Sequence, residues 1–296
     1  MSRVLITGSR GLIGTALARR LRESGREVVP FDVACEAGAG PDDILDAARV
    51  AAALAGCSGV VHLAAVSRVI WGEQDPARCQ AVNVEGTRNI LTAARESGRD
   101  PWVLVASSRE VYGDATRFPV PESAPFRPLN AYARSKTDVE ELVAASRAAG
   151  LRASVVRFSS VYGSTADHPD RVAPAFARLA AAGQTLRVDG TGTTLDFTHL
   201  DDVATALHRA VDALSQEGRA LPALHLVSGR ATTLLELAEI AVKAAGSGRV
   251  ELRPARPYDV RKFVGDPARA AEVLGWRACT TLEDGMARLV RGFGAP

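Results

Sequence analysis

Apolar positions along this chain follow two periods. A short apolar run at residues 4–6 predicts a buried strand, and the apolar residues that follow recur at the spacing of one helix face. Further strands are expected near 27–31, 59–64, 102–107 and 152–158, and helices near 45–55, 76–97, 131–149 and 171–182. This alternation predicts an α/β fold in which helices cover both faces of a parallel sheet.

Three glycines stand between the first predicted strand and the first predicted helix. In the segment Thr7-Gly8-Ser9-Arg10-Gly11-Leu12-Ile13-Gly14, Gly8 allows a tight turn, Gly11 lets the backbone approach a pyrophosphate, and Gly14 permits close packing of helix on strand. The helix start also offers free N–H groups to phosphates. The segment therefore predicts a dinucleotide site of the Rossmann type, although a plain flexible turn would use the same residues.

Asp32 ends the second predicted strand, about 20 residues after the glycine turn, where a carboxylate that binds ribose is expected. A carboxylate there accepts hydrogen bonds from the ribose hydroxyls of NAD and repels the 2′-phosphate of NADP. Arg10 argues for NADP instead, since a guanidinium in the turn is able to pair with that phosphate. We expect NAD.

Tyr132 and Lys136 stand four residues apart and share one face of a predicted helix. The reference pKa of tyrosine is about 10, so a phenolate near neutral pH requires stabilisation. A neighbouring ammonium and the positive charge of oxidised nicotinamide have the right sign to lower that pKa. The pair predicts a catalytic base, whereas the simpler alternative is a surface pair on a helix.

The chain resembles the short-chain dehydrogenase/reductase superfamily. Two features carry this resemblance, the tight spacing of Gly8, Gly11 and Gly14 and the pair of Tyr132 and Lys136. Further motifs resemble its extended branch, the NAD-dependent nucleotide-sugar epimerases and dehydratases. These are Asp43-Ile44, His62-Leu63-Ala64-Ala65, Asn83-Val84-Glu85-Gly86-Thr87 and Ser107-Ser108-Arg109-Glu110-Val111-Tyr112-Gly113. The residues expected to contact NAD are Gly8, Arg10, Gly11, Leu12, Ile13, Gly14, Asp32, Asp43, Ile44, Leu63, Ala64, Ala65, Asn83, Tyr132 and Lys136.

The resemblance also implies the catalytic roles. Tyr132 takes the proton from the substrate hydroxyl, Lys136 holds the nicotinamide ribose, and Ser108 hydrogen-bonds the reacting oxygen. Many dehydratases of the family carry an Asp-Glu pair where this chain has Arg109-Glu110. The missing Asp argues against a dTDP-glucose type of dehydratase, whereas Glu110 either takes part in catalysis or forms an ion pair with a cation such as Arg109.

The substrate motifs depart from the family pattern. The segment from Arg157 to Gly163 resembles Arg-x-x-Asn-Val-Tyr-Gly with Ser160 at the Asn position, and Leu195 stands where an Arg that binds diphosphate is common. Arg256 matches another family arginine that reaches the diphosphate, although a neighbouring Gly of the pattern is replaced by Tyr. The residues expected to bind substrate are Ser108, Arg109, Ser160 and Arg256.

The leading hypothesis is C4 epimerisation of a nucleotide-activated sugar through a transient 4-keto intermediate. Three alternatives stay open: a 4,6-dehydratase or decarboxylase of nucleotide sugars, an NAD-dependent dehydrogenase or reductase of another hydroxylated substrate, and a sensor that binds the dinucleotide without turnover. Ser160 and Leu195 also leave room for a substrate that is not a nucleotide sugar.

Composition excludes other classes. The formal net charge of +2 shows no basic excess that would indicate nucleic acid binding. The four cysteines lack metal-site spacing, so neither a metal nor a disulfide framework is expected. Residues 50–67 carry no formal charge, but glycines, a serine and a histidine interrupt them, so no membrane span is expected. The chain enters its first strand at once, which favours a cytoplasmic protein.

The expected organisation is a Rossmann domain over residues 1–165 and, over residues 166–296, mainly a smaller lobe that closes the substrate cleft. The boundary is approximate, because the chain is expected to cross between the lobes. The Pro-rich segment 118–128 resembles a loop over the active site. By resemblance the protein is a homodimer in which the helices near 76–97 and 131–149 form a four-helix bundle, through alanines that include Ala93, Ala94, Ala144 and Ala145.

Overall fold

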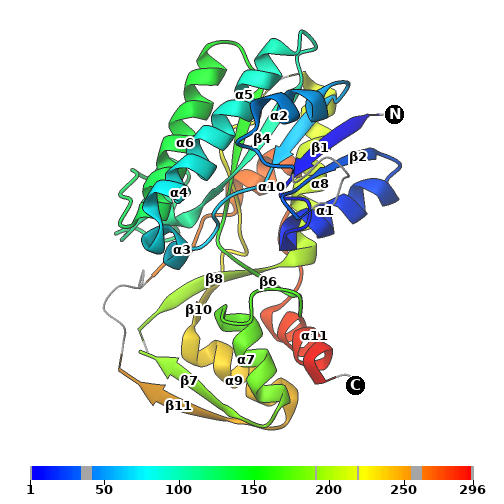
Figure 1. Cartoon of the computed structure of the whole chain (residues 1–296). Helices are drawn as coiled ribbons and strands as arrows, with labels where there is room; N and C mark the ends of the chain where they lie inside the picture. Colours follow the sequence, from blue (N-terminus) through cyan, green and yellow to red (C-terminus); the bar gives the residue numbers. More distant parts are fainter. Residues whose placement is uncertain (1, 35–41, 191, 219, 255–261, 295–296) are drawn as a thin grey trace.

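A six-stranded parallel sheet organises the larger part of the molecule (Figure 1). The computed structural model describes residues 2–34, 42–190, 192–218, 220–254 and 262–294. The strand order is β2-β1-β3-β4-β5-β9, and all neighbouring strands are parallel. The strands are β1 (Arg3–Thr7), β2 (Glu27–Phe31), β3 (Gly59–His62), β4 (Trp102–Ser108), β5 (Ala153–Phe158) and β9 (Leu224–Leu226).

Helices cover both faces of this sheet. One layer holds α1 (Leu12–Glu23), α8 (Leu200–Glu217) and α10 (Ala268–Leu274), and the other holds α2 (Ala47–Leu54), α5 (Gly86–Glu96) and α6 (Ala131–Ala148). Val4 and Ile6 of β1 pack in the first layer, whereas Leu5 packs in the second. Because successive strand residues point to opposite faces, a short continuous apolar run fills both cores. The predicted α/β, doubly wound parallel sheet is confirmed.

The segment predicted as one helix over residues 76–97 is divided in the structure. It consists of α4 (Pro76–Gln80), a π-helical turn η1 (Ala81–Glu85) and α5, and it follows a short helix α3 (Val69–Gln74) that the sequence did not predict. π-Helical turns widen a helix locally and often occur at functional sites. Asn83, expected to contact the cofactor, lies within this turn.

The second part of the molecule is built around its own core. A sheet of β10 (Ala231–Thr233), β8 (Thr194–His199) and β6 (Ser160–Tyr162) and a pair of β7 (Thr185–Asp189) and β11 (Arg249–Arg253) enclose this core with α7 (Val172–Ala181), α9 (Leu234–Ala245) and α11 (Leu282–Gly294). The C-terminal third is not confined to this lobe, since α8, β9 and α10 return to the larger part. The division near residue 165 stays a prediction.

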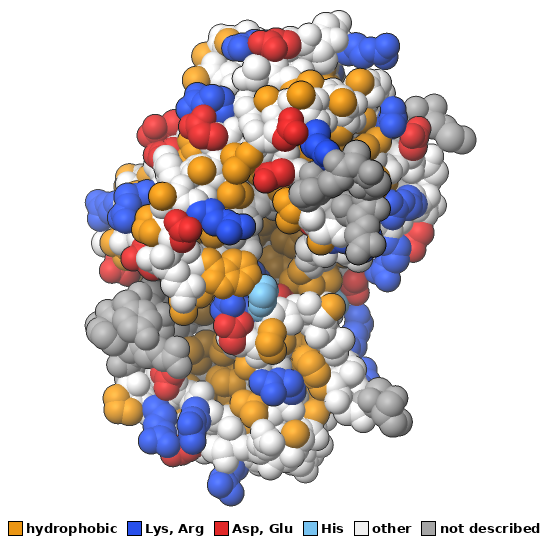
Figure 2. All heavy atoms as spheres, in the orientation of Figure 1, with side chains coloured by type: hydrophobic (Ala, Val, Ile, Leu, Met, Phe, Trp, Pro, Cys, Tyr) orange, Lys and Arg blue, Asp and Glu red, His pale blue; other side chains and the backbone are white. Residues whose placement is uncertain are grey.

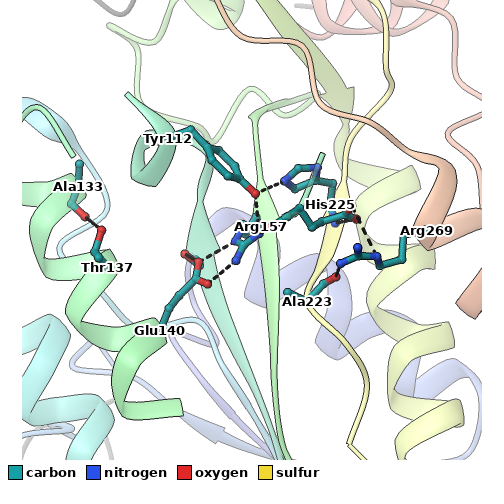
Figure 3. Close-up of polar contacts among 10 residues, drawn as sticks. Tyr112, Ala133, Thr137, Glu140, Arg157, Ala223, His225 and Arg269 are labelled. Atoms are coloured by element: carbon teal, nitrogen blue, oxygen red, sulfur yellow. Dashed lines mark hydrogen bonds and ion pairs between the residues drawn. The ribbon is translucent and has the colours of Figure 1, made fainter. Parts of the chain in front are cut away.

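A buried ion pair fixes α6 against the sheet (Figure 3). Arg157 of β5 donates from Nε and Nη2 to the two carboxylate oxygens of Glu140 on α6, at 2.8 and 2.6 Å. Ser107 of β4 also donates to Glu140, and Tyr112 links Arg157 to His225 of β9. Such a bidentate pair is stronger and more directional than a single hydrogen bond. It sets the position of α6 beside the end of β4.

No helix in the described part of the chain is both long enough and apolar enough to span a membrane.

Candidate active site

The carboxyl ends of β1, β3 and β4 meet at one edge of the large sheet. Strand β2 lies on one side of β1 and β3 lies on the other, so the strand order reverses at this place. Open α/β sheets bind their ligands in the crevice outside such a switch point. Thr7 pairs with His62 in the ladder, which brings the glycine turn after β1 beside the segment that follows β3.

The glycine turn is tightly packed against its surroundings. Gly8 has a φ of +69°, and a Cβ on it would lie 2.7 Å from the backbone nitrogen of Ala64. A Cβ on Gly14 would lie 2.1 Å from the carbonyl oxygen of Gly8. No side chain of the residues that the structure describes caps the start of α1 at Gly11, so its first N–H groups are available for phosphate oxygens.

Asp32 holds the turn from the end of β2. Its Oδ2 accepts a hydrogen bond from the backbone N–H of Arg10 at 2.9 Å, and its Oδ1 accepts one from Ala34 at 3.0 Å. Arg10 itself is exposed. Ser9, a residue that the sequence interpretation did not single out, has a buried hydroxyl without a hydrogen-bond partner in the described chain. A free helix start, an unsatisfied hydroxyl and a carboxylate at the strand end together fit a dinucleotide.

Other residues expected to contact NAD are engaged within the protein. The Asn83 side chain accepts from the Val66 N–H at 2.8 Å and donates to the Val66 carbonyl and to Ser135 Oγ at 3.1 and 2.8 Å. It thereby ties the segment after β3 to α6. Leu63, Ala64 and Ala65 are half-buried in that segment.

Asp43 and Ile44 have mainly local contacts. Asp43 accepts from the N–H of Leu45 at 3.0 Å, and Ile44 is buried in the core. A Cβ on Gly86 would lie 2.4 Å from Ile44 Cδ1, so the glycine of the Asn-x-x-Gly-Thr motif makes room for this side chain. The contact of Asp43 and Ile44 with adenine stays a prediction.

His62 forms a buried link that the sequence did not reveal. Its Nδ1 lies 2.7 Å from Thr7 Oγ1 and its Nε2 lies 3.0 Å from Thr87 Oγ1. Burial, with a smaller contribution from the charge of Lys136, lowers the pKa of His62 to about 3. The neutral ring therefore joins β1, β3 and α5 beneath the cofactor edge.

Ser108, Tyr132 and Lys136 come together as the sequence predicted. Asn130 caps the start of α6 by accepting from the Ala133 N–H at 2.8 Å, and Lys136 Nζ donates to the carbonyl of Ala106 in β4 at 3.0 Å. The side chain of Ser108, the last residue of β4, lowers the pKa of Tyr132, so the two side chains lie near each other. All three are buried.

The acidity of Tyr132 differs from the expectation. Burial raises its pKa to about 12, against a hydrogen bond from Ser108 that lowers it, and Lys136 is not among the largest influences. Burial also lowers the pKa of Lys136 to about 8. The expected effect of the Lys136 ammonium on Tyr132 is therefore outweighed, because the phenolate loses its hydration. Oxidised nicotinamide, when bound, would add a positive charge that lowers this pKa, beside the effects of Ser108 and Arg171.

Glu110 lies beside this group. Arg109 Nη2 is 3.1 Å from Glu110 Oε1, and Asn130 Nδ2 donates to Oε2 at 3.4 Å. The charge of Glu110 raises the pKa of Tyr132, which places the carboxylate near the phenol. The ion pair that the sequence left as an alternative is present. Arg109 Nη1 is buried and has no hydrogen-bond partner among the described residues, as expected of a group that binds substrate.

The residues of the second lobe that the substrate motifs singled out are not gathered in one place. Ser160 is half-buried in β6, whereas Leu195 belongs to the apolar core of that lobe. Arg256 lies outside the described residues. The sequence interpretation also missed Arg171, whose charge lowers the pKa of Tyr132 from the start of α7.

A Rossmann sheet with this glycine turn and a Ser-Tyr-Lys group at its carboxyl edge defines an NAD-dependent oxidoreductase of the short-chain dehydrogenase/reductase type. The chain belongs to the NAD dependent epimerase/dehydratase family, whose model matches residues 4–221. Its cofactor is NAD. The resemblance inferred from the motifs is confirmed.

Three similar proteins illustrate the range of the family. The chain is 31% identical to UDP-glucose 4-epimerase of Mycolicibacterium smegmatis, over 98% of both proteins. It is 30% identical to dTDP-glucose 4,6-dehydratase of Streptomyces antibioticus, over 97% of this chain and 91% of that protein. The structure superposes on UDP-glucose-4-epimerase from Stenotrophomonas maltophila, crystallised with NAD and formylated UDP-arabinopyranose, with a TM-score of 0.90 and 27% identity, covering 99% and 98% of the two chains.

Proposed function

We propose that this protein is an epimerase that inverts C4 of a nucleotide-activated sugar. Tyr132 removes the proton of the 4-hydroxyl, and Ser108 holds the reacting oxygen in place. Bound NAD supplies the hydride acceptor and, in the return step, the hydride donor. The 4-keto sugar then presents its other face in the cleft, and Tyr132 returns the proton. Because the redox cycle closes, NAD is not consumed.

The convergence of Ser108, Tyr132 and Lys136 at the carboxyl end of β4 carries this proposal. It brings two groups to one point where a single substrate oxygen is able to contact both, while Lys136 is anchored one helical turn further along α6. The NAD-dependent family and the named 4-epimerases at about 30% identity support the reaction class.

The state of Glu110 favours epimerisation over elimination. Elimination needs an acid that protonates the leaving hydroxyl and a base that removes a proton from carbon. Arg109 stands where many dehydratases of the family carry an Asp, so the side chain expected to supply that acid is missing. Glu110 shares its two oxygens between Arg109 and Asn130, which weakens it as a base.

A dehydratase or decarboxylase is the second candidate, because Glu110 is buried and its charge acts directly on Tyr132. A carboxylate in that place is able to serve as a base once substrate displaces Asn130. The resemblance to a dTDP-glucose 4,6-dehydratase also supports it.

One experiment separates these functions. Purified protein is incubated with UDP-, GDP- and dTDP-hexoses and UDP-uronic acids plus catalytic NAD, and the anomeric protons are followed by NMR. A C4 epimer that reaches an equilibrium mixture supports the proposal, and Tyr132→Phe should lose about 100- to 10,000-fold in rate while it still binds NAD. A 4-keto-6-deoxy sugar or a pentose would identify the second candidate, and accumulation of NADH would identify a dehydrogenase.

We also propose a homodimer formed through α5 and α6. A surface groove between these helices is lined by Arg88, Leu91, Leu142 and Ala145 among others. Ala144 and Ala145 are exposed, as a helix interface requires, but Ala94 belongs to the core of its own subunit and Ala93 packs against that core. Light scattering tests the dimer, and a strict monomer would refute it. The cytoplasmic location stays a prediction.

A further inference from the structure

The short segment between β6 and α7 brings an acidic and a basic side chain to the junction of the two parts. Asp167 is only 8% exposed, and its Oδ1 lies 3.5 Å from Nε of Arg171, the residue before α7. The same segment contacts α3 of the larger part, because Arg68 donates to Asp170 at 2.7 Å and the rings of Trp71 and His168 lie 4.7 Å apart.

Contacts through α3 place this segment near the reacting group. A Cβ on Gly72 of α3 would lie 3.0 Å from Tyr132 Cβ, and the neighbouring Trp71 contacts His168 of the segment. The charge of Arg171 lowers the pKa of Tyr132, and the charges of both Arg171 and Arg68 lower that of Asp167. Tyr132 and Arg68 belong to the larger part, whereas Asp167 and Arg171 belong to the connection into the second lobe. Asp167 therefore lies where the two parts meet. Figure 2 shows the surface hollowed between these parts, with hydrophobic, basic, acidic and histidine side chains at the edges of the hollow.

One oxygen of Asp167 has no hydrogen-bond partner among the described residues. Oδ1 accepts from the backbone N–H of His168 at 2.8 Å, but Oδ2 is buried without a hydrogen bond to any described residue. Buried polar atoms almost always have a partner, and an exception needs an explanation such as an absent ligand. Burial raises the pKa of Asp167 in spite of Arg171 and Arg68, so keeping the carboxylate there is costly.

We propose that Asp167 Oδ2 accepts a hydrogen bond from a ring hydroxyl of the bound sugar other than the 4-hydroxyl, while Arg171 holds the carboxylate in place. The proposal rests on the proposed function and makes Asp167 a specificity-determining residue. A sugar that lacks this hydroxyl leaves the oxygen buried and unpaired, so it binds more weakly.

The test compares sugars that lack single hydroxyls. Calorimetry measures the binding of UDP-glucose and of its 2-, 3- and 6-deoxy analogues. Two NAD-loaded proteins are compared, Tyr132→Phe and the double variant that also carries Asp167→Asn. The Tyr132→Phe substitution blocks turnover in both. We expect Asp167→Asn to weaken UDP-glucose binding about 10- to 100-fold, and to leave unchanged the binding of the one analogue that lacks the contacted hydroxyl. An equal loss with every sugar, or no loss, would overturn the proposal.

The matched control is Asp170→Asn. Asp170 lies on the same segment and also pairs with an arginine, but it is exposed. The substitution of Asp170 should change the affinity for UDP-glucose and for all three analogues by the same factor. If Asp167→Asn does not fold, a crystal structure of the Tyr132→Phe protein with NAD and UDP-glucose decides, since Oδ2 must then lie about 2.5 to 3.0 Å from a sugar hydroxyl. The absence of that contact would overturn the proposal.

The outcomes also separate this inference from the proposed function. If UDP-glucose and its analogues give the expected binding pattern but wild-type protein forms no C4 epimer, the Asp167 contact stands and the epimerase proposal fails. If the epimer forms and the deoxy pattern is absent, only the Asp167 contact fails. If UDP-glucose does not bind, both fail for this sugar.

Discussion

At the scale of single residues, the site depends on ionisable side chains that are buried away from water. Lys136 and Tyr132 are both buried. Burial lowers the pKa of Lys136 and raises that of Tyr132, so it favours the neutral form of each side chain. A protein bears such a cost only where other interactions hold the groups in place, as the bond from Lys136 to Ala106 does. The cost is measurable through its dependence on pH.

Lys136→Met tests the burial of the ammonium. The pKa of Lys136 falls from 10.5 to about 8 in the folded protein, so the unfolded chain binds the proton more tightly. The wild-type protein should therefore gain stability relative to the variant as the pH rises from 8 to 10.5, by up to about 3 kcal/mol.

Urea denaturation at several pH values measures this gain. Lys243→Met, at an exposed position of α9, is the control for the loss of a lysine and should show no such trend. A stability difference between Lys136→Met and wild type that does not change with pH would contradict the prediction.

Asp32→Ala tests the choice of NAD. Loss of the hydrogen bonds from the ribose hydroxyls to this carboxylate should weaken NAD binding about 10- to 100-fold. It should also reduce the preference for NAD over NADP, and calorimetry measures both effects. Asp46→Ala removes another aspartate that accepts a backbone N–H, at the start of α2, and should leave NAD affinity nearly unchanged. An Asp32→Ala protein with wild-type NAD affinity would refute the assigned role of this carboxylate.

At the scale of elements, the position of α6 governs the site. This helix carries Tyr132 and Lys136, and its contact with the sheet passes through the buried pair of Glu140 and Arg157 (Figure 3). Because Glu140 lies one turn beyond Lys136, the pair also sets the height of the lysine along β4. The same interaction therefore stabilises the fold and orients the face of α6 that carries Tyr132 and Lys136.

Glu140→Gln should destabilise the protein by about 3 to 5 kcal/mol, since it leaves the Arg157 charge buried without its counter-ion. Chemical denaturation measures the effect. Glu141→Gln changes the adjacent, exposed glutamate and should cost much less. Equal effects of the two substitutions would show that the buried pair does not support α6.

At the scale of the whole molecule, the contacts that cross between the parts include the ion pair of Arg68 with Asp170 and the ring contact of Trp71 with His168. Asp170 is largely exposed, so that the ion pair is weak. We therefore expect the loss of this ion pair to have only a small effect.

Arg68→Ala should raise the KM for the nucleotide sugar about 2- to 5-fold, with little change in kcat, because an exposed ion pair contributes up to about 1 kcal/mol. Steady-state kinetics and NAD titration measure this. Arg3→Ala breaks an exposed ion pair with Glu27 inside the larger part and should leave the KM unchanged. A loss of NAD affinity in Arg68→Ala would contradict a role limited to the junction.

Local patterns were sufficient for much of this description. The apolar run at residues 4–6, the glycines after it and the i, i+4 spacing of Tyr132 and Lys136 predicted the sheet, the cofactor turn and the catalytic face of α6. These features depend on neighbours in sequence, through strand and helix periodicity and the steric freedom of glycine. Ser108 followed from a motif at the end of β4.

Only the tertiary structure decided the rest, because burial and pairing join residues far apart in the chain. It divided the helix over 76–97 around Asn83, showed that burial outweighs Lys136 in setting the pKa of Tyr132, and returned β9 to the large sheet. It also left Asp167 Oδ2 at the junction without a hydrogen-bond partner in the described part of the chain. Desolvation depends on everything packed around a group, and the spacing of residues in the sequence does not contain that information.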